Sequence, residues 1–347
     1  MKVLTVVGAR PQFIKAAVLR RLFFENGIKE ILVHTGQHYD YQMSKVFFDE
    51  LSMKPPEYFV ELKGRSHGAM TGEILANCEK ILEKEKPDIC LVYGDTNSTI
   101  AGALAASKIH IPVCHVEAGL RSFNKNMPEE INRILTDHIS DVLFCSSFTA
   151  LENLRNENII KDVYHVGDIM HDAVKMFANA SSLETLVPEY TKSTKPLAVM
   201  TVHRQETVNS DDLLIKIMRY CRALTEKYSI IFPAHPRTEN RIKELGIDLG
   251  LIKMIKPLPY RSIHALLGSS SLVITDSGGL QKEAYFHKVR CITLRNETEW
   301  IETIKYGWNR LWTQKDFVCE PRDIPEYGSG NSAQKIIKIL KQKYSAN

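Results

Sequence analysis

Short apolar runs rich in β-branched residues alternate with segments of helical periodicity along the whole chain. In those segments apolar residues recur every three or four positions, as on the buried face of a helix. Strands that are separated by helices predict right-handed βαβ crossovers and parallel sheets, hence an α/β fold. Eight runs have the length and composition of buried strands: Val3–Val7, Ile31–His34, Ile89–Tyr93, Val113–Glu117, Val142–Cys145, Leu197–Val202, Ile230–Ala234 and Leu272–Thr275.

The chain is long enough for two domains. Its 347 residues exceed one ordinary domain. The region from Ser181 to Pro196 is rich in Ser, Thr and Pro and lacks a strong pattern, as expected for a connector. We expect two Rossmann-like, doubly wound domains at 1–170 and 171–330, with a cleft between them. A C-terminal helix within 331–347 is expected to pack back on the first domain.

Composition and charge narrow the class of protein. The chain is 44% hydrophobic and 25% charged, which is typical of a globular protein. Its net charge of +4 is small, and no Lys/Arg block is interleaved with aromatic residues, so we expect no nucleic-acid partner. No apolar run approaches the ~20 residues of a membrane span, and the first run is too short for a signal peptide. The seven cysteines lack C-x-x-C spacing, which predicts free, packed thiols in a cytoplasmic protein.

Common cofactor and metal motifs are absent from the sequence. There is no G-x-G-x-x-G after the first strand, no G-x-x-x-x-G-K-[ST] and no G-x-S-x-G. His34 and His38 are four residues apart, but Thr35 and Gly36 between them break any helix, which argues against a zinc site. We therefore expect neither a cofactor nor a metal.

The segment from Ser271 to Glu283 has the local pattern of a phosphate site. An apolar, strand-like run breaks at Asp276-Ser277-Gly278-Gly279 and restarts as a helix. The two glycines let the backbone approach a ligand closely, and the first N–H groups of the helix are left free to bind an anion. Asp276 and Ser277 are also good N-cap residues, so these four residues alone fit an ordinary turn equally well.

Ionisable residues gather where predicted strands end or the next helices begin. In open parallel sheets, ligands bind beyond the carboxyl ends of the strands, so these residues are candidates for a site. If these residues converge on one cleft, the carboxylates and the histidine would form an acid/base set beside cations that hold an anion. They are Asp95, Glu117, Glu129 and Glu130, the cations Arg10, Lys15 and Arg133, and His203 beside Arg204.

Each of these residues also has an ordinary explanation. Glu129 and Glu130 sit in a first helical turn, where acidic side chains complement the helix dipole. Asp95 could be only the N-cap of the next helix. Glu117 is harder to dismiss, because an ionisable group that ends an apolar strand is costly unless it is paired or used. The residues alone indicate two Rossmann-like lobes that bind a phosphate-bearing small molecule.

Seven short motifs, taken together and in order, resemble those of the non-hydrolysing UDP-N-acetylglucosamine 2-epimerase family. Any one of them is a weak signal, whereas six or more in order over most of the chain are a strong one. They are Gly8-Ala9-Arg10-Pro11-Gln12-Phe13-Ile14-Lys15, His34-Thr35-Gly36-Gln37-His38, Gly94-Asp95-Thr96, His115-Val116-Glu117-Ala118-Gly119-Leu120-Arg121, Pro128-Glu129-Glu130-Ile131-Asn132-Arg133, His203-Arg204 and Asp276-Ser277-Gly278-Gly279.

The resemblance implies a glycosyltransferase-B type (GT-B) fold, with a UDP-sugar in the cleft between its lobes. It implies that UDP-GlcNAc and UDP-ManNAc are interconverted by inversion at carbon 2 of the sugar, without a cofactor. UDP is eliminated to leave a 2-acetamidoglucal and then adds back to the opposite face. The resemblance further implies a homodimer that makes precursors of surface polysaccharides.

The resemblance also implies roles for individual residues. Asp95, Glu117, Glu129 and His203 match the catalytic positions, and which carboxylate is the base at carbon 2 stays open. The phosphates would be bound at the start of the helix after 276, and the ribose hydroxyls by Glu283. The residues implied in substrate binding are Arg10, Lys15, Arg133, Ser277, Gly278, Gly279, Glu283 and Arg295.

One departure from the family pattern bears on the substrate. The family usually has Thr-Glu-Arg-Pro where this chain has Thr298-Glu299-Trp300-Ile301, so a cation expected near the diphosphate is missing. Arg295 is the candidate to replace it. The Glu-Trp pair resembles the branch that acts on UDP-2,3-diacetamido-2,3-dideoxyglucuronate, which is the alternative substrate.

Other classes of function stay open at this point. A GT-B glycosyltransferase would share the fold but usually carries acceptor-binding insertions in its N-terminal half, where this chain has short loops. A hydrolysing epimerase would not match the non-hydrolysing motifs. A nucleotide-sugar sensor would have no need of Asp95, Glu117 and Glu129 together.

Overall fold

The computed structural model describes residues 1–347 apart from 38–47, 49, 52, 63–65, 178–193 and 345–347. The chain divides into two compact units, Met1–Ala173 with Pro325–Asn347, and Val174–Ile324. The units change after residue 173, where the sequence analysis expects a change after 170. The chain re-enters the first unit at Pro325, earlier than the expected residue 331. Most of the expected connector at 181–196 lies outside the described residues.

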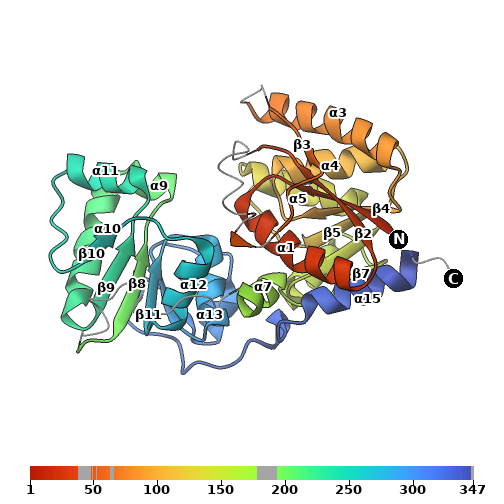
Figure 1. Cartoon of the computed structure of the whole chain (residues 1–347). Helices are drawn as coiled ribbons and strands as arrows, with labels where there is room; N and C mark the ends of the chain where they lie inside the picture. The colour runs from red at the N-terminus through yellow and green to blue at the C-terminus, as the bar shows by residue number, and fades with distance from the viewer. Residues whose placement is uncertain (38–47, 49, 52, 63–65, 178–193, 345–347) are drawn as a thin grey trace. The chain divides into compact units, whose positions relative to one another are not determined.

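The first unit is built around a seven-stranded parallel sheet with the order β3-β2-β1-β4-β5-β6-β7. Its strands are β1 (Lys2–Val7), β2 (Lys29–His34), β3 (Tyr58–Phe59), β4 (Ile89–Tyr93), β5 (Val113–Ala118), β6 (Val142–Cys145) and β7 (Val163–His165). Its helices include α1 (Arg10–Glu25), α3 (His67–Glu85), α4 (Asn97–Lys108), α5 (Pro128–Ile139), α6 (Phe148–Asn156) and α15 (Ser332–Tyr344), and α7 (Ile169–Phe177) leads out of it. Figure 1 shows α3 and α4 on one side of the sheet and α1 and α15 on the other. Because helices cover both faces, the strands are near-continuous apolar runs.

The second unit repeats this plan with a six-stranded parallel sheet of order β10-β9-β8-β11-β12-β13. Its strands are β8 (Leu197–Thr201), β9 (Ser229–Pro233), β10 (Lys253–Ile255), β11 (Leu272–Thr275), β12 (Arg290–Thr293) and β13 (Asn309–Leu311). Its helices include α9 (Gln205–Val208), α10 (Asp211–Ala223), α11 (Pro236–Glu244), α12 (Tyr260–Gly268), α13 (Gly278–Phe286) and α14 (Ile301–Lys305). Alternate residues of β8 face opposite sides, since Met200 packs in one apolar cluster with α10 and Val199 in another with α12 and α13.

In each unit the strand order reverses beside the first strand of the sheet. β1 lies between β2 and β4, and β8 lies between β9 and β11. Doubly wound sheets bind their ligands at the carboxyl ends of the strands that flank such a reversal. The residues that follow β1 and β4 in the first unit, and β8 and β11 in the second, are therefore the ones placed to form a site.

The cysteines agree with the expectation from composition. All seven cysteines are free, six of them are buried and Cys319 is partly exposed. They are therefore packed thiols, as predicted. Within the described part of the chain, no helix is both long enough and apolar enough to cross a membrane.

A buried carboxylate near the amino-terminal ends of the strands gives the first unit a pH dependence. Glu30 of β2 accepts a hydrogen bond from Thr5 Oγ1 at 2.6 Å and lies 3.6 Å from Arg20 Nε. Burial raises the pKa of Glu30 to about 7, against the hydrogen bond from Thr5 and the charge of Arg20, from an ordinary value of 4.5. Because the folded state prefers the protonated carboxyl, this contribution to stability is fully present below pH 4.5 and is lost as the pH rises to about 7.

Replacement of Glu30 by glutamine is expected to remove most of this dependence. Between pH 4.5 and about 7, the wild-type protein should lose roughly 2–3 kcal/mol more unfolding free energy than Glu30→Gln. Calorimetric unfolding at both ends of this range measures the difference, with Glu25→Gln on the exposed face of α1 as the control. An identical pH dependence of Glu30→Gln and wild type would contradict a protonated Glu30.

Candidate active site

Gly8 and Gln12 hold the loop that follows β1. A Cβ at Gly8 would lie 2.0 Å from Ser98 Oγ, so only glycine fits there. Gln12 Oε1 accepts a hydrogen bond from the Gly8 N–H at 2.7 Å, and its amide donates to the Tyr93 carbonyl of β4 at 2.6 Å. This side chain joins the ends of β1 and β4 and sets the start of α1, where Arg10 is the first residue.

Glu117, near the end of β5, has a strained backbone. Its φ is +73°, in the left-handed region that residues other than glycine rarely adopt. The pairing of β5 with β6 shifts register between Val116 and Ala118, on either side of it. Such strain costs about 1–3 kcal/mol and persists where the surroundings hold it, often at functional sites. Here the buried Nζ of Lys15 in α1 forms an ion pair with Glu117 Oε2.

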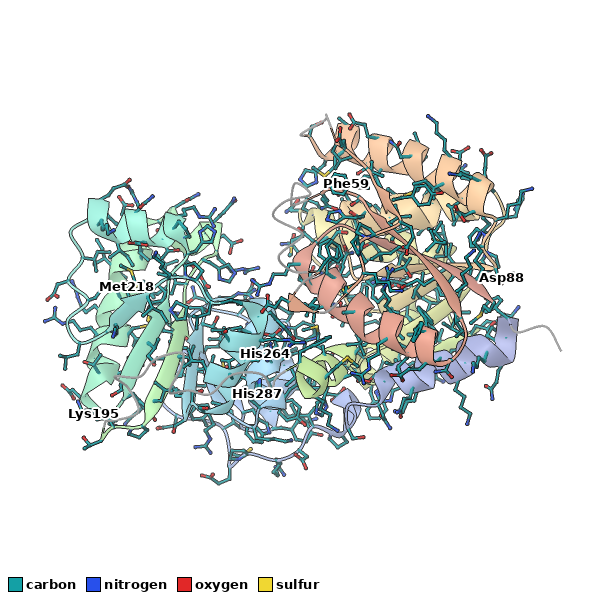
Figure 2. The ribbon with its side chains drawn as sticks, in the orientation of Figure 1. Phe59, Asp88, Lys195, Met218, His264 and His287 are labelled. Carbon is teal, nitrogen blue, oxygen red and sulfur yellow. The ribbon has the colours of Figure 1, made fainter. Side chains whose placement is uncertain are left out.

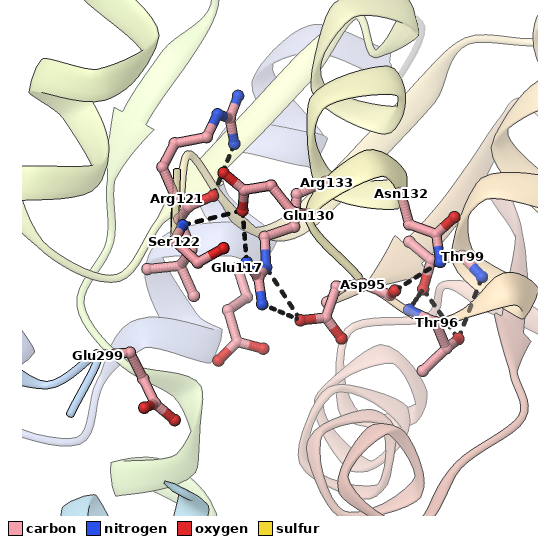
Figure 3. A network of polar contacts seen from close by, with 12 residues as sticks. Asp95, Thr96, Thr99, Glu117, Arg121, Ser122, Glu130, Asn132, Arg133 and Glu299 are labelled. Carbon is pink, nitrogen blue, oxygen red and sulfur yellow. Dashed lines mark hydrogen bonds and ion pairs between the residues drawn. The ribbon is translucent and has the colours of Figure 1, made fainter. Parts of the chain in front are cut away.

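Arg133 of α5 joins two carboxylates that come from different segments (Figure 3). Its Nη2 lies 2.9 Å from Asp95 Oδ2, after β4, and its Nη1 donates to Glu130 Oε2 at 2.7 Å. Burial raises the pKa of Asp95, with the opposing charge of Arg133 limiting the rise and the nearby charge of Glu117 adding to it. Glu130 accepts two backbone N–H groups of the β5–α5 loop at 2.9 and 2.8 Å. Burial on its own would raise the pKa of Glu130, but these hydrogen bonds lower it below its ordinary value.

A buried chain of polar side chains supports the turn that carries Asp95. His115 of β5 donates from Nε2 to the Gly94 carbonyl at 2.8 Å, and its Nδ1 lies 2.7 Å from Asp137 Oδ1. Arg121 donates to the other carboxylate oxygen of Asp137 at 2.7 Å. None of these three side chains is more than 1% exposed. His115 therefore holds Gly94 in place and, through it, Asp95.

In the second unit, Asp276 ties the loop after β8 to the end of β11. Its buried carboxylate accepts the N–H of His203 at 3.0 Å and that of Arg204 at 2.9 Å. The imidazole of His203 is 47% exposed, and its Nδ1 lies 3.5 Å from the same carboxylate. The N-cap of α13 is Ser277, whose Oγ accepts the Leu280 N–H at 3.4 Å. Asp276 thus sets the position of His203 and not the start of the helix.

The two glycines at the start of α13 have different surroundings. A Cβ at Gly278 would lie 2.4 Å from Glu299 Oε1, so a larger residue would force a shift. A Cβ at Gly279 would meet none of the described heavy atoms within 4 Å, so the first turn is open on that side. Because the first N–H groups of a helix have no intrahelical partner, this open end can bind an anionic group.

Comparison with known proteins connects this fold to a family. The family model for UDP-N-acetylglucosamine 2-epimerase matches residues 20–341. The chain belongs to the UDP-N-acetylglucosamine 2-epimerase family. Its two parallel sheets flanked by helices match the solved structures of these enzymes, which have the GT-B fold. The family consists of isomerases, so the predicted fold class and enzyme class are confirmed.

Three relatives show how much of this epimerase the likeness covers. A UDP-N-acetylglucosamine 2-epimerase homolog from Methanococcus maripaludis is 46% identical over 98% of this chain and 99% of its own. A UDP-2,3-diacetamido-2,3-dideoxy-D-glucuronate 2-epimerase from Pseudomonas aeruginosa is 44% identical, again over 98% and 99%. The crystal structure of Methanocaldococcus jannaschii UDP-GlcNAc 2-epimerase in complex with UDP-GlcNAc and UDP is 38% identical, with a TM-score of 0.85 over 99% of this chain and 100% of that one. The likeness therefore spans both units.

In this epimerase Glu130, and not the neighbouring Glu129, joins the charged network of the first unit. Glu130 is 1% exposed and bound to Arg133. Glu129 is exposed in the first turn of α5, and no hydrogen bond or ion pair among the described residues joins it to Arg133. By position in the sequence both glutamates are candidates, but the family motifs give the catalytic role to Glu129 and none to Glu130. The signal that could have found it is its three-residue spacing from Arg133, which places both on one helix face.

Trp300 lies against Lys282 of α13, a cation to which the sequence motifs give no role. The indole Nε1 donates to the Gly278 carbonyl at 2.9 Å, and Lys282 Nζ lies 3.7 Å from the centroid of the indole ring. Arg295, the predicted replacement for the missing cation, forms an ion pair with Glu299 at 2.7 Å. Lys282 follows Gly278 by four residues, so both lie on one helix face. This spacing is the signal that could have identified Lys282 from the sequence.

No group of three or more potential metal ligands occurs within the described part of the epimerase. His34 is buried, and its Nδ1 accepts the Gly36 N–H at 2.8 Å. Burial lowers the pKa of His34 to about 4, so it is a neutral core residue near pH 7. His38 lies outside the described residues.

Proposed function

We propose that this protein is a non-hydrolysing epimerase that interconverts UDP-GlcNAc and UDP-ManNAc. The observation that carries the proposal is the likeness over both full chains to an epimerase solved with UDP-GlcNAc and UDP. A base removes the proton from carbon 2 while the C1–O bond to UDP breaks, which leaves a C1=C2 double bond in 2-acetamidoglucal. UDP then adds back to carbon 1 and a proton to the other face of carbon 2. No electron donor or acceptor is consumed.

The first unit holds the groups that we propose for proton transfer at the sugar. The ammonium of Lys15 compensates the negative charge of Glu117, which suits a carboxylate base. Burial raises the pKa of Asp95, which suits a carboxyl that holds a proton and delivers it. A carboxylate paired with a cation and a buried carboxyl of raised pKa are suited to act as base and acid. Glu129 stays a third candidate, at the exposed start of α5.

The second unit holds the groups that we propose for the nucleotide. The open first turn of α13 would bind the diphosphate, and stabilisation of this leaving anion must supply much of the rate. Glu283, later on the same helix, would bind the ribose hydroxyls. The residues of this unit that we propose for the diphosphate are Ser277, Gly278, Gly279 and His203.

Lys282 is expected to add the positive charge that the diphosphate requires. Lys282→Met should weaken UDP binding about 10-fold, because a charge-assisted contact contributes roughly 1.5–3 kcal/mol. The salt dependence of the affinity should also become shallower. Titration calorimetry with UDP at low and high salt measures both effects, with Lys305→Met at the exposed end of α14 as the control. An affinity equal to that of wild type would remove Lys282 from the site.

Two observations keep a second substrate in the test, although the family model favours UDP-GlcNAc. A relative that is 44% identical is named for UDP-2,3-diacetamido-2,3-dideoxy-D-glucuronate. Trp300 also stands where the family resemblance leads us to expect arginine. The chemistry at carbon 2 would be the same for this substrate, so the choice concerns only the groups that contact the sugar.

Proton NMR in deuterated water tests the reaction and the substrate. With UDP-GlcNAc we expect deuterium to replace the proton on carbon 2 while UDP-ManNAc accumulates. Exchange with the diacetamido-glucuronate alone would select the second substrate, and free N-acetylmannosamine would indicate hydrolysis. Exchange with neither compound would overturn the proposal and favour a GT-B glycosyltransferase.

The assembly and location are further parts of the proposal. We infer a cytoplasmic homodimer that supplies an activated sugar for surface polysaccharides, on the strength of the family resemblance. Sedimentation equilibrium distinguishes a single chain of 39.5 kDa from a dimer of twice that mass.

A further inference from the structure

Three polar side chains form a chain inside the second unit. His264 of α12 and His287, which ends α13, face each other with Nδ1 of the first 2.8 Å from Nε2 of the second. The other ring nitrogen of His264, Nε2, lies 3.7 Å from Glu283 Oε1. Figure 2 labels the two histidines within this unit. The chain thus ends on the carboxylate that we propose for the ribose.

The Nε2 atom of His264 lacks a hydrogen bond among the described residues, although the side chain is fully buried. A buried polar atom in this state is costly, so the site favours any small movement that supplies a partner. Glu283 Oε1 lies just beyond hydrogen-bond distance from it. A short shift of the Glu283 carboxylate towards α12 would complete the contact.

The chemistry of the three groups sets the order of donors. A carboxylate only accepts, so His264 must carry hydrogen on Nε2 to bind Glu283. When the His264 ring carries this hydrogen alone, its Nδ1 accepts from His287 Nε2. Burial lowers the pKa of His287 to about 4, and the neighbouring His264 lowers it as well. His287 is therefore neutral near pH 7, with one N–H to donate. His287 therefore donates a hydrogen bond to His264, and His264 can donate one to Glu283.

We propose that His264, oriented by His287, is a positioning residue that holds the Glu283 carboxylate for the ribose of the nucleotide. The inference rests on the proposed function, in which Glu283 accepts hydrogen bonds from the ribose hydroxyls. A carboxylate has about four acceptor sites, so it can accept from His264 and from the ribose together. A carboxylate that is already held loses less freedom when the nucleotide binds. The histidine pair therefore acts on ribose recognition and not on carbon 2.

Binding of UDP and of 2′-deoxy-UDP to the full-length protein, measured by titration calorimetry, tests the proposal. The wild-type protein should bind UDP about 10- to 100-fold more tightly, because the lost hydroxyl leaves a charged acceptor with one hydrogen bond fewer. Glu283→Gln should remove most of this preference. His264→Leu should reduce it to about threefold or less, and should raise KM for the UDP-sugar more than it lowers kcat.

Two conservative variants separate positioning from folding. In His264→Gln the amide nitrogen takes the place of Nε2, whereas in His264→Asn it takes the place of Nδ1. We expect His264→Gln to keep the preference for UDP and His264→Asn to lose it. The control is His165→Asn in the first unit, whose imidazole donates to the Glu326 carbonyl at 2.7 Å. It should keep the full preference.

The outcomes distinguish this inference from the proposed function. A full preference for UDP in His264→Asn, with the fold intact by circular dichroism, would overturn the role of His264 and leave the proposed function standing. Equal binding of the two nucleotides by the wild-type protein would overturn the role of Glu283, and that of His264 with it. If the wild-type protein failed to bind UDP at all, both the proposed function and this inference would fall.

Discussion

Replacement of Glu117 by glutamine is expected to lower the rate of epimerisation about 10²- to 10⁴-fold, the usual contribution of a positioned acid or base. Glutamine keeps the shape of the side chain but cannot take the proton from carbon 2. The rate of deuterium exchange at carbon 2, with saturating UDP-GlcNAc, measures the effect. Glu83→Gln makes the same chemical change on the exposed face of α3 and should retain the wild-type rate. Wild-type turnover in Glu117→Gln would exclude Glu117 from catalysis.

The same variant is expected to lose stability, because Lys15 keeps a charge that is nearly buried. The two side chains are only 7% and 13% exposed, and removal of one partner from such a pair costs about 3–5 kcal/mol. The double variant Lys15→Met/Glu117→Gln should regain most of this stability. Circular dichroism of Glu117→Gln at the assay temperature shows whether its lost activity is a result of unfolding.

Asp137→Asn is expected to destabilise the first unit by about 3 kcal/mol and to lower turnover as well. Asp137 balances the buried guanidinium of Arg121 and orients His115. Glu157 retains a second ion pair with Arg121 at 2.7 Å. The expected loss of stability is therefore at the lower end of the range for breaking a buried ion pair. Without its orientation, His115 would no longer hold the Gly94 carbonyl, and Asp95 would move from its place in the site.

Calorimetric unfolding and the exchange assay below the unfolding transition measure the two effects of Asp137→Asn. Asp141→Asn is the control, since Asp141 is exposed and accepts the Val113 N–H at 2.9 Å. We expect it to cost about 1 kcal/mol or less and to keep the wild-type rate. Equal losses of stability and turnover in the two variants would contradict a special role for the buried side chains of Arg121, Asp137 and His115 that support Gly94.

The strands differ in how well the sequence predicts them. All eight predicted strands are present, because strands covered by helices on both faces are near-continuous apolar runs. Five further strands, β3, β7, β10, β12 and β13, are not predicted. Four of them are the edges of the two sheets, and the fifth, β12, lies next to an edge. The four edge strands have only two or three residues, too few to carry a pattern, and β12 has four residues and begins with the charged Arg290.

The sequence predicts where the candidate site residues lie, but not which side chains they pair with. The motifs place Asp95, Glu117 and His203 at the carboxyl ends of strands, and the structure has Glu117 near the end of β5 and the other two in the loops after β4 and β8. The motifs contain Lys15 and Asp276 but do not show that these residues pair with Glu117 and His203. Lys15 lies 102 positions from Glu117, and Asp276 lies 73 positions from His203.

The amino-acid sequence alone determines the α/β class, the parallel sheets and the loops that carry the candidate residues. These features depend on apolar period and on turn chemistry, which are local properties of the chain. Only the tertiary structure decides that Glu130 turns inward while Glu129 faces solvent, and that Lys282 lies under an indole ring. Burial and pairing at these positions depend on which distant segments pack there, and no local pattern encodes that packing.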